Sequence, residues 1–533
     1  MGARIKLFHD IDIGSWALSD PTDPNRVRLP LATAILCAGR IDLIAQDTEK
    51  AGAGNRDSGP PSMVRRAQLA GRAQARGPLA MCWTPWHDSF MKQLAGSLVC
   101  SVFITSLCFA AEEGAEKYWP QWRGPNANGV ATHGSPPVTW SETENVRWKV
   151  EIPGRGSSTP IIWGDRLYLT TAVPTEKSVS SDSVPAPRSH GSFRHPMVSA
   201  ATRYHRFFVL AIDRETGKTV WQKEVKDALP HEGTHEYGNF ATGSAMTDGE
   251  RVFAFFGSRG LYCFDTKGEI QWEKNFGEMT IRLGFGEGAS PVLYGDKILL
   301  AWDHEGDSFI VALDKRTGEE IWRTEREEMT SWATPLVVEH DGGAQVVTSA
   351  TQRIRSYDVA TGKLVWETSG MTFNTIPSPV SANGVVYVTS GFRGNLLLAI
   401  RLSQARGDIA DSGAIVWSHD RDTPYVPSPL LYEGVLYLLK RNSNVLSAFD
   451  AVTGERYYQT RLQSVGDVFS SPVAADGRFY VTGREGTTVV MKSGREPEVL
   501  ETNSLKDGFD ASMAIVDNEI YLRGSRYLYR ISE

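Results

Sequence analysis

The stretch Ala211–Trp221 reads AIDRETGKTVW, and its pattern A-x-D-x-x-T-G-x-x-x-W returns along the chain. Further copies are Ala312–Trp322, Ser356–Trp366, Ala448–Tyr458 and a shortened form, CFDTKGEIQW, that ends at Trp272. Asp213 and Asp450 lie five units apart, which gives about 47 residues per unit. A repeat of this length is typical of a β-propeller blade.

A second motif precedes each copy: a small residue, then Ser or Thr, often Pro, and apolar residues up to a Gly or Asp turn. Eight such stretches begin at Ser158, Gly243, Ala289, Ala333, Pro377, Pro427, Ser470 and Ala511. Each unit thus supplies four short strands with alternating apolar residues. A four-stranded twisted sheet cannot cover both its faces, so we expect the units to stack radially, with each Trp or Tyr between neighbouring sheets.

The two ends of the repeat complement each other. The last unit ends in RYLYRISE and lacks a Trp strand, whereas NVRWKVEI (Asn145–Ile152) is a Trp strand with no unit before it. The predicted fold is therefore all-β: an eight-bladed β-propeller of four-stranded antiparallel blades over residues 145–533. The N-terminal strand closes the last blade, and a lead-in segment, residues 111–144, precedes it.

Composition agrees with a soluble globular chain. The 533 residues have a formal net charge of -7 and are 41% hydrophobic and 22% charged. Mild acidity removes the positive field that would attract nucleic acid, so we expect no nucleic-acid partner. We expect a monomer.

The N-terminal region predicts export. Residues 1–90 show no sustained periodicity and are interpreted as a mis-called or disordered extension. Met91 and Lys92 then begin a short positive region, an apolar run follows from Leu94 to Phe109, and the residues before Ala111 suit cleavage after Ala110. We therefore expect translation from Met91, a signal peptide over 91–110, no stable membrane span, and a periplasmic or secreted protein. A long leader or a single N-terminal anchor is the alternative.

The repeats, the eight Ser-Pro-like strands and the start YWPQWRGPNANGV (Tyr118–Val130) resemble the pyrroloquinoline-quinone-like (PQQ-like) propeller family. The resemblance is strongest to secreted members with a WPxWRGP start. The family also includes quinoprotein dehydrogenases and the propeller lipoprotein of outer-membrane protein assembly. The resemblance specifies the fold closely and the function poorly.

Two sets of loops are expected on one face of the propeller, which we call the mouth. The loops that lead into the innermost strands carry Arg155, Asn239, Glu287, Trp332, Asn374, Tyr425, Asp467 and Asp510. The loops between second and third strands carry an arginine in six of eight blades: Arg259, Arg353, Arg393, Arg441, Arg484 and Arg523. Blade three has WDHEGDSF instead, with Asp303.

If the six arginines converge, the mouth is a positive ring with one acidic sector, suited to an anionic ligand. The alternative is that each arginine holds its own turn or pairs with a neighbouring acid. Blade one replaces the arginine by an insertion, Val173–Arg203, with His190, Arg194 and His195, interpreted either as a lid or as a disordered excursion.

His231 and His235 fall in HEGTH, which matches the zinc-protease pattern H-E-x-x-H. Pro230 and Gly233 argue against the helix that this chemistry requires, so these histidines are weak metal candidates, and we predict no metal and no catalytic residues.

The favoured interpretation is a cofactor-free binding or scaffolding propeller whose arginine-lined mouth takes an anionic small molecule, a glycan or an envelope protein. One alternative is a PQQ-dependent dehydrogenase, which would hold the quinone on arginines and Trp332 beside a Ca²⁺ bound by groups such as Glu287 and Asn374. A scaffold for envelope protein assembly is a second alternative.

Overall fold

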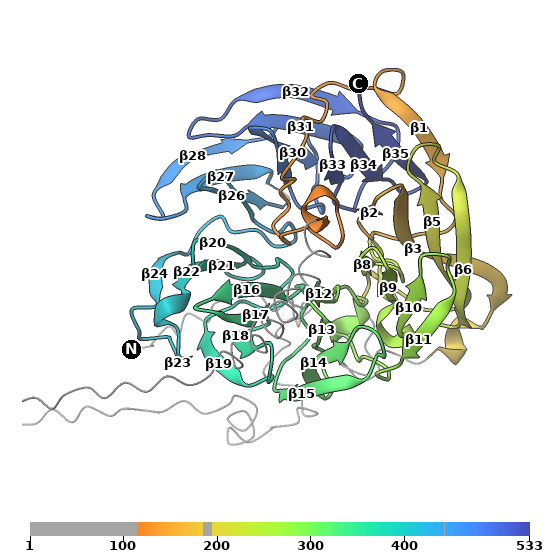
Figure 1. Cartoon of the computed structure of the whole chain (residues 1–533), viewed down its shortest axis with the longest axis horizontal. Helices are drawn as coiled ribbons and strands as arrows, with labels where there is room; N and C mark the ends of the chain where they lie inside the picture. Colours follow the sequence, from red (N-terminus) through yellow and green to blue (C-terminus); the bar gives the residue numbers. More distant parts are fainter. Residues whose placement is uncertain (1–113, 185–194, 442) are drawn as a thin grey trace, which may run out of the picture. The chain divides into compact units, whose positions relative to one another are not determined.

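The computed structural model describes residues 114–184, 195–441 and 443–533. The expected extension and signal peptide lie outside these residues. Eight antiparallel sheets succeed one another around a common axis (Figure 1). The structure therefore confirms the eight-bladed propeller. Within the described ranges, no helix is long and apolar enough to cross a membrane.

The blades follow the chain, with the innermost strand first in each. Blade one contains β2 (Ile161–Trp163), β3 (Arg166–Ser178), β5 (Arg203–Asp213) and β6 (Thr219–Ala228), and blade two contains β8 (Met246–Thr247), β9 (Arg251–Phe255), β10 (Leu261–Asp265) and β11 (Ile270–Lys274). Blade three contains β12 (Val292–Tyr294), β13 (Lys297–Trp302), β14 (Ser308–Asp314) and β15 (Glu320–Arg326). Blade four contains β16 (Leu336–His340), β17 (Gly343–Ser349), β18 (Arg353–Asp358) and β19 (Leu364–Ser369).

Blade five contains β20 (Val380–Ala382), β21 (Val385–Ser390), β22 (Leu396–Arg401) and β24 (Ile415–His419), and blade six contains β25 (Leu430–Tyr432), β26 (Val435–Lys440), β27 (Val445–Asp450) and β28 (Arg456–Arg461). Blade seven contains β29 (Val473–Ala475), β30 (Arg478–Thr482), β31 (Thr487–Lys492) and β32 (Val499–Ser504). Blade eight contains β33 (Ala514–Val516), β34 (Glu519–Arg523), β35 (Tyr527–Ile531) and β1 (Val146–Glu151). The N-terminal strand β1 pairs antiparallel with β35, so it closes blade eight as predicted.

The repeated A-x-D-x-x-T-G-x-x-x-W motif builds both a turn and a contact between blades. Asp213 Oδ1 accepts hydrogen bonds from the Thr216 amide and hydroxyl groups, which fixes the turn between the third and fourth strands. The indole of Trp148 then lies on Gly217 of the next blade, where a Cβ atom would come within 2.9 Å of the ring. Because Gly217 also has a φ of +70°, glycine suits both the turn and the packing.

Blade four departs from this pattern. Its Trp366 donates to Gln345 Oε1 at 3.0 Å, within the same blade, and is fully buried. The insertion Ser403–Gly413 interrupts blade five where the next T-G turn would stand, and its short strand β23 (Gly407–Asp408) pairs parallel with β19. Leu402 and Ile409 join the core around Trp366. The insertion therefore takes the place of the missing turn.

The small residues of the second motif form a ring of hydroxyl groups around the axis. We call Thr159, Ser244, Ser290, Thr334, Ser378, Ser428, Ser471 and Ser512 the hydroxyl ring. Seven hydrogen bonds link these eight residues in order, each from a backbone N–H to the hydroxyl oxygen of the next member, at 2.8–3.1 Å. At the eighth junction, between blades eight and one, the buried Thr159 Oγ1 has no hydrogen-bond partner. The recurring Ser or Thr thus has a structural role.

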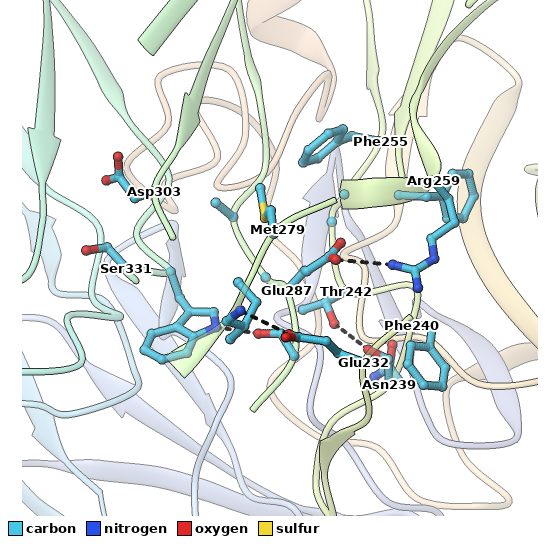
Figure 2. A pocket seen from close by; sticks show the side chains of 18 of the residues that line it. Glu232, Asn239, Phe240, Thr242, Phe255, Arg259, Met279, Glu287, Asp303 and Ser331 are labelled. Carbon is cyan, nitrogen blue, oxygen red and sulfur yellow. Dashed lines mark hydrogen bonds and ion pairs between the residues drawn. The ribbon is translucent and has the colours of Figure 1, made fainter. Parts of the chain in front are cut away.

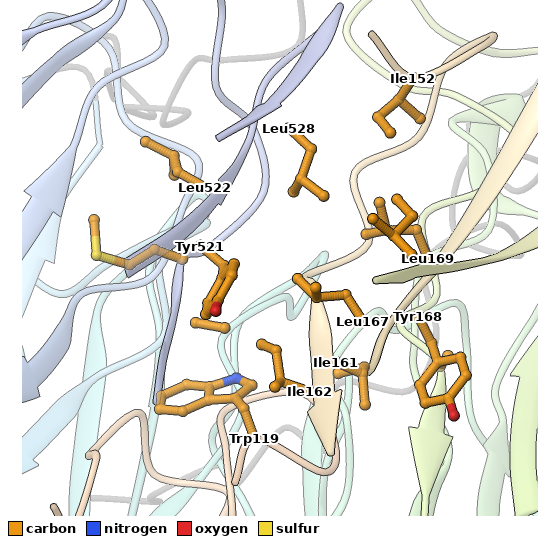
Figure 3. Close-up of a cluster of buried hydrophobic side chains, with 14 of the residues drawn as sticks. Trp119, Ile152, Ile161, Ile162, Leu167, Tyr168, Leu169, Tyr521, Leu522 and Leu528 are labelled. Atoms are coloured by element: carbon orange, nitrogen blue, oxygen red, sulfur yellow. The ribbon is translucent and has the colours of Figure 1, made fainter. Parts of the chain in front are cut away.

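Apolar side chains fill the spaces between blades. At the junction of blades eight and one, Ile161, Ile162, Tyr521 and Leu528 belong to one buried cluster with Trp119 of the lead-in segment (Figure 3). Trp119 is fully buried and exchanges two backbone hydrogen bonds with Ile162. The lead-in segment is therefore part of the core of the propeller.

Candidate functional site

The lead-in segment crosses the end of the axis opposite the mouth. Pro120 O accepts from the Thr247 amide in blade two, and Gln121 Oε1 accepts from Leu293 N in blade three. Val130 pairs with Ala474 in blade seven. The segment thus contacts blades on both sides of the axis. We call it the floor.

Arg123 fixes the floor through main-chain acceptors. Its guanidinium donates to the carbonyl oxygens of Pro429, Pro472 and Asn128 at 2.5–3.1 Å. The side chain is fully buried, and burial lowers the pKa of Arg123 to about 9. A buried guanidinium bonded to three carbonyl groups is a structural tie between the floor and blades six and seven.

Above the floor lies an axial cavity of about 490 Å³. Its aromatic lining is Trp122, Tyr237, Phe285, Trp332, Phe392, Tyr425 and Phe469. Its hydroxyl lining comprises six members of the hydroxyl ring, Ser244, Ser290, Thr334, Ser428, Ser471 and Ser512. Trp122 comes from the lead-in segment and the other aromatic residues from mouth loops. A cavity of this size, apolar with convergent polar groups, is typical of ligand sites.

Two of the six predicted arginines lie together at the mouth. The guanidinium groups of Arg441 and Arg484 lie on Phe469, each 4.1 Å from its ring centroid. Asp467 pairs with Arg441 at 3.2 Å, and Asp510 pairs with Arg484 at 2.5 Å. Both positive charges are therefore matched by carboxylates that stand on the loops leading into the next innermost strands.

The other four arginines do not join this pair. Arg523 is buried in the wall, where its guanidinium donates to Ser158 Oγ and Thr170 O, and burial lowers its pKa to about 9. Arg353 pairs with Glu367 at 2.9 Å, beside a separate cavity between blades three and four. Arg393 is exposed and lies beside Phe392. The convergent ring of six is thus not observed, because only Arg441 and Arg484 lie together.

Arg259 belongs to a small enclosed cavity between blades two and three (Figure 2). It pairs with Glu287 at 3.1 Å and is 8% exposed. Glu287 also accepts from the Ser258 amide and hydroxyl groups at 2.7 and 2.5 Å. Arg259 and Glu287 therefore compensate each other, and Glu287 is not available as a free carboxylate for the axial cavity.

The histidines of HEGTH take separate places. His231 Nε2 contacts Met279 O at 2.7 Å, and its Nδ1 contacts Arg259 at 3.1 Å. Burial, and then the charge of Arg259, lower the pKa of His231. His235 lies in the short strand β7 (Thr234–His235) beside Phe285. The motif is not helical, and the described residues contain no cluster of three groups suited to a metal ion.

Asp303, the predicted acidic sector, is buried. Arg326 binds it at 3.0 Å and also lies near Glu328. Burial raises the pKa of Asp303, and it raises the pKa of Glu328 to about 7. This group of side chains, which Arg355 and Glu367 extend, connects blades three and four. Asp303 is therefore part of a buried ionic network.

The ends of the blade-one insertion are described, but His190 and Arg194 lie outside the described residues. Strand β4 (Val198–Ser199) pairs with β7, and the Glu236 amide donates to Met197 O at 2.7 Å. His195 and Met197 line the axial cavity. The C-terminal end of the insertion is thus part of the mouth.

Trp332 and Tyr425 line the cavity as expected, whereas Asn374 is buried and is not among the lining residues. The predicted site residues did not include four aromatic residues that line the cavity: Trp122, Tyr237, Phe392 and Phe469. Phe469 stands two residues after Asp467 in GDVFSS, so the aromatic residues of the mouth loops were a usable signal.

Comparison with known proteins agrees with the fold. Residues 205–406 and 306–533 match the model of a family described as outer membrane protein assembly factor BamB. Two curated proteins of that name are similar: one from Francisella salina, 26% identical over 182 residues (30% of this chain, 33% of the relative), and one from Yersinia pestis, 25% identical over 240 residues (41% and 57%). The matches thus span about a third to just over half of these relatives.

Two solved structures are similar to this chain at low sequence identity. BamB from Moraxella catarrhalis has a TM-score of 0.48 and 13% identity, covering 72% of this chain and 98% of that one. A quinohemoprotein alcohol dehydrogenase from Comamonas testosteroni has a TM-score of 0.49 and 12% identity, covering 80% and 84%. Since the family model covers more than half of the sequence, this chain belongs to the PQQ-like propeller family described as outer membrane protein assembly factor BamB.

Proposed function

We propose that this protein is a binding and scaffolding propeller of the cell envelope, with the mouth of the axial cavity as its binding site. The observation that carries the proposal is the axial cavity itself, which has the floor held by Arg123, a lining from the hydroxyl ring and a rim of aromatic side chains. Its walls are rigid strands, and its rim is built from loops, the usual division between scaffold and specificity.

The relatives named as outer membrane protein assembly factors support a role with protein partners. Outer membrane protein assembly would place the protein in the periplasm, in agreement with the signal peptide expected at Met91. Tyr237 and Phe469 at the rim are large aromatic side chains of the kind that anchors protein interfaces.

The dehydrogenase alternative needs arginines that can clamp the carboxylates of a quinone. Arg441 and Arg484 are paired with Asp467 and Asp510, Arg259 is paired with Glu287, and Arg523 is buried. Trp332 is held by a hydrogen bond from its indole N–H to Gly286 O at 2.7 Å. These side chains do not fit the clamp that a tricarboxylated quinone needs.

Site-specific photo-crosslinking tests the proposal. A benzophenone side chain replaces Tyr237, which is 36% exposed at the mouth, and in a matched control it replaces Val452, which is 77% exposed in a turn on the opposite face. We expect adducts in a native envelope extract from position 237 and not from position 452. Equal adducts from both positions, or none from position 237, would contradict a binding mouth.

A further inference from the structure

The charges at the axial cavity are already compensated. Arg441 and Arg484 are each bound to an aspartate, and both guanidinium groups lie 4.1 Å from the ring centroid of Phe469. An anionic ligand would have to compete with Asp467 and Asp510 at close range, and a cationic ligand would have to compete with the arginines. The cavity therefore favours a ligand without net charge.

The hydroxyl ring offers the cavity hydroxyl groups whose hydrogens are free to donate a hydrogen bond. Six members of the hydroxyl ring line the cavity, and each accepts one backbone N–H through its oxygen. Within the part of the chain that the structure describes, none of the six donates to a protein acceptor. An aliphatic hydroxyl group has one donor and two acceptor sites, so a donor and a lone pair remain for a ligand on each.

The cavity wall on the mouth side of the hydroxyl ring presents fixed aromatic rings. Phe392 and Tyr425 stack on each other with centroids 4.8 Å apart, on the blade-five side. On the loop that leads into blade four, Trp332 is oriented by its indole hydrogen bond to Gly286 O. Gly288 allows the indole to approach closely, since a Cβ atom there would lie 2.9 Å from the ring. These rings supply flat apolar surfaces within reach of the hydroxyl ring.

A wholly apolar ligand would leave the hydroxyl groups of the hydroxyl ring without partners, which is unfavourable in a buried site. A saccharide suits both the hydroxyl ring and the aromatic rings, because its hydroxyl groups donate and accept hydrogen bonds and the C–H faces of its rings pack on aromatic side chains. On the basis of the proposed function, we infer that the ligand of the axial cavity is a neutral saccharide, bound with its ring against Trp332 or Tyr425 and its hydroxyl groups on the hydroxyl ring.

Isothermal titration calorimetry on residues 111–533 with maltohexaose, cellohexaose and N-acetylated chitohexaose tests the inference, with citrate and a hexaglutamate peptide as charged probes. We expect at least one neutral sugar to bind with a dissociation constant below about 1 mM, and the charged probes to bind at least tenfold more weakly. If none of the three sugars binds in this range, or if citrate binds as tightly, the inference is wrong.

Two serines of the hydroxyl ring provide a matched pair of variants. Ser428 and Ser378 each accept one backbone N–H in the ring, at 3.0 and 2.8 Å, but only Ser428 lines the cavity. S428A should weaken sugar binding about fivefold to tenfold, and S378A should leave it within twofold. Equal losses would show that the ring matters only for folding, and the melting temperatures of both variants report that effect separately.

The outcomes separate this inference from the proposed function. If position 237 forms adducts with a protein and none of the three sugars binds in the calorimeter, the mouth binds a protein partner and the saccharide inference fails alone. If neither adducts nor sugar binding appear, both fail. Loss of the adducts on adding the sugar that binds in the calorimeter supports both.

Discussion

The two ends of the axis use arginine in different ways. At the floor, Arg123 is fully buried and bonded to three main-chain carbonyl groups. At the mouth, Arg441 is paired with a carboxylate and lies against aromatic rings, and its side chain keeps 16% of its exposure. Carbonyl acceptors are fixed by the backbone, whereas side-chain acceptors can rearrange. The floor is therefore a structural element, and the mouth is adjustable.

The largest difference in stability should appear between two single variants in which Arg123 or Arg441 is replaced by methionine. R123M leaves three carbonyl groups without their charged donor in a buried site, and should lower the free energy of unfolding by about 3 kcal/mol or more. R441M removes a partly exposed pair and should cost about 1 kcal/mol or less. Urea denaturation of residues 111–533 measures both. Similar losses would mean that the floor is no more structural than the mouth.

A glycine pair tests how tightly the floor is packed. Gly129 and Gly477 both have positive φ, +81° and +71°. A Cβ atom at Gly129 would lie 2.8 Å from Arg123 Cζ, whereas a Cβ atom at Gly477 meets nothing within 4 Å. Both alanine variants should lose about 1 kcal/mol through backbone strain. G129A should lose about 2 kcal/mol more by denaturation, and an equal loss in both would show that Arg123 moves freely.

The pH dependence of stability should come from the mouth side. Burial raises the pKa of Glu328 to about 7 from 4.5. A carboxyl group whose pKa rises on folding binds its proton more tightly in the folded state, so its contribution is complete below about pH 4.5 and is lost as the pH rises to about 7. The pKa of Arg123, about 9, keeps the floor charged throughout this range.

Between pH 4.5 and 7.5, wild type should therefore lose on the order of 2 kcal/mol of stability relative to E328Q, whose side chain stays neutral. Denaturation of both proteins at several pH values measures the difference. The prediction is wrong if the two curves remain parallel.

The smallest effect concerns the compensation at the mouth. D467N removes the carboxylate that binds Arg441 at 3.2 Å and approaches Arg484 at 3.8 Å. The affinity for citrate should rise about tenfold, which corresponds to about 1.4 kcal/mol. D411N, in the exposed insertion of blade five, is the control and should change nothing. Unchanged citrate affinity in D467N would mean that other groups neutralise the mouth.

The sequence predicted the fold well because each blade is a local pattern. The turn at Asp213, the stacking of Trp148 on Gly217 and the pairing of β1 with β35 follow from the fixed spacing of residues within the repeated motif. Trp332 and Tyr425 were also predicted at the cavity, because the loops that lead into innermost strands must meet at one face.

The site was predicted less well because loops at the same position in different repeats place their arginine side chains differently, some buried in the wall and some at the mouth. Arg523 and Arg441 occupy the same place in their repeats, yet one is buried beside Gly156 and the other lies at the mouth. No local pattern shows that the lead-in segment, with Trp122 and Arg123, would lie across the axis. Two of the three carbonyl groups that Arg123 binds, those of Pro429 and Pro472, are more than 300 residues away in sequence.

By itself, then, the sequence determined the all-β class, the number of blades and the closure of the ring, since these depend on short-range turns and on strand periodicity. Only the tertiary structure decided which arginines are paired, which are buried and what lines the axial cavity. Pairing and burial depend on distances between loops of different blades, and those distances are set by the radial packing of the whole propeller.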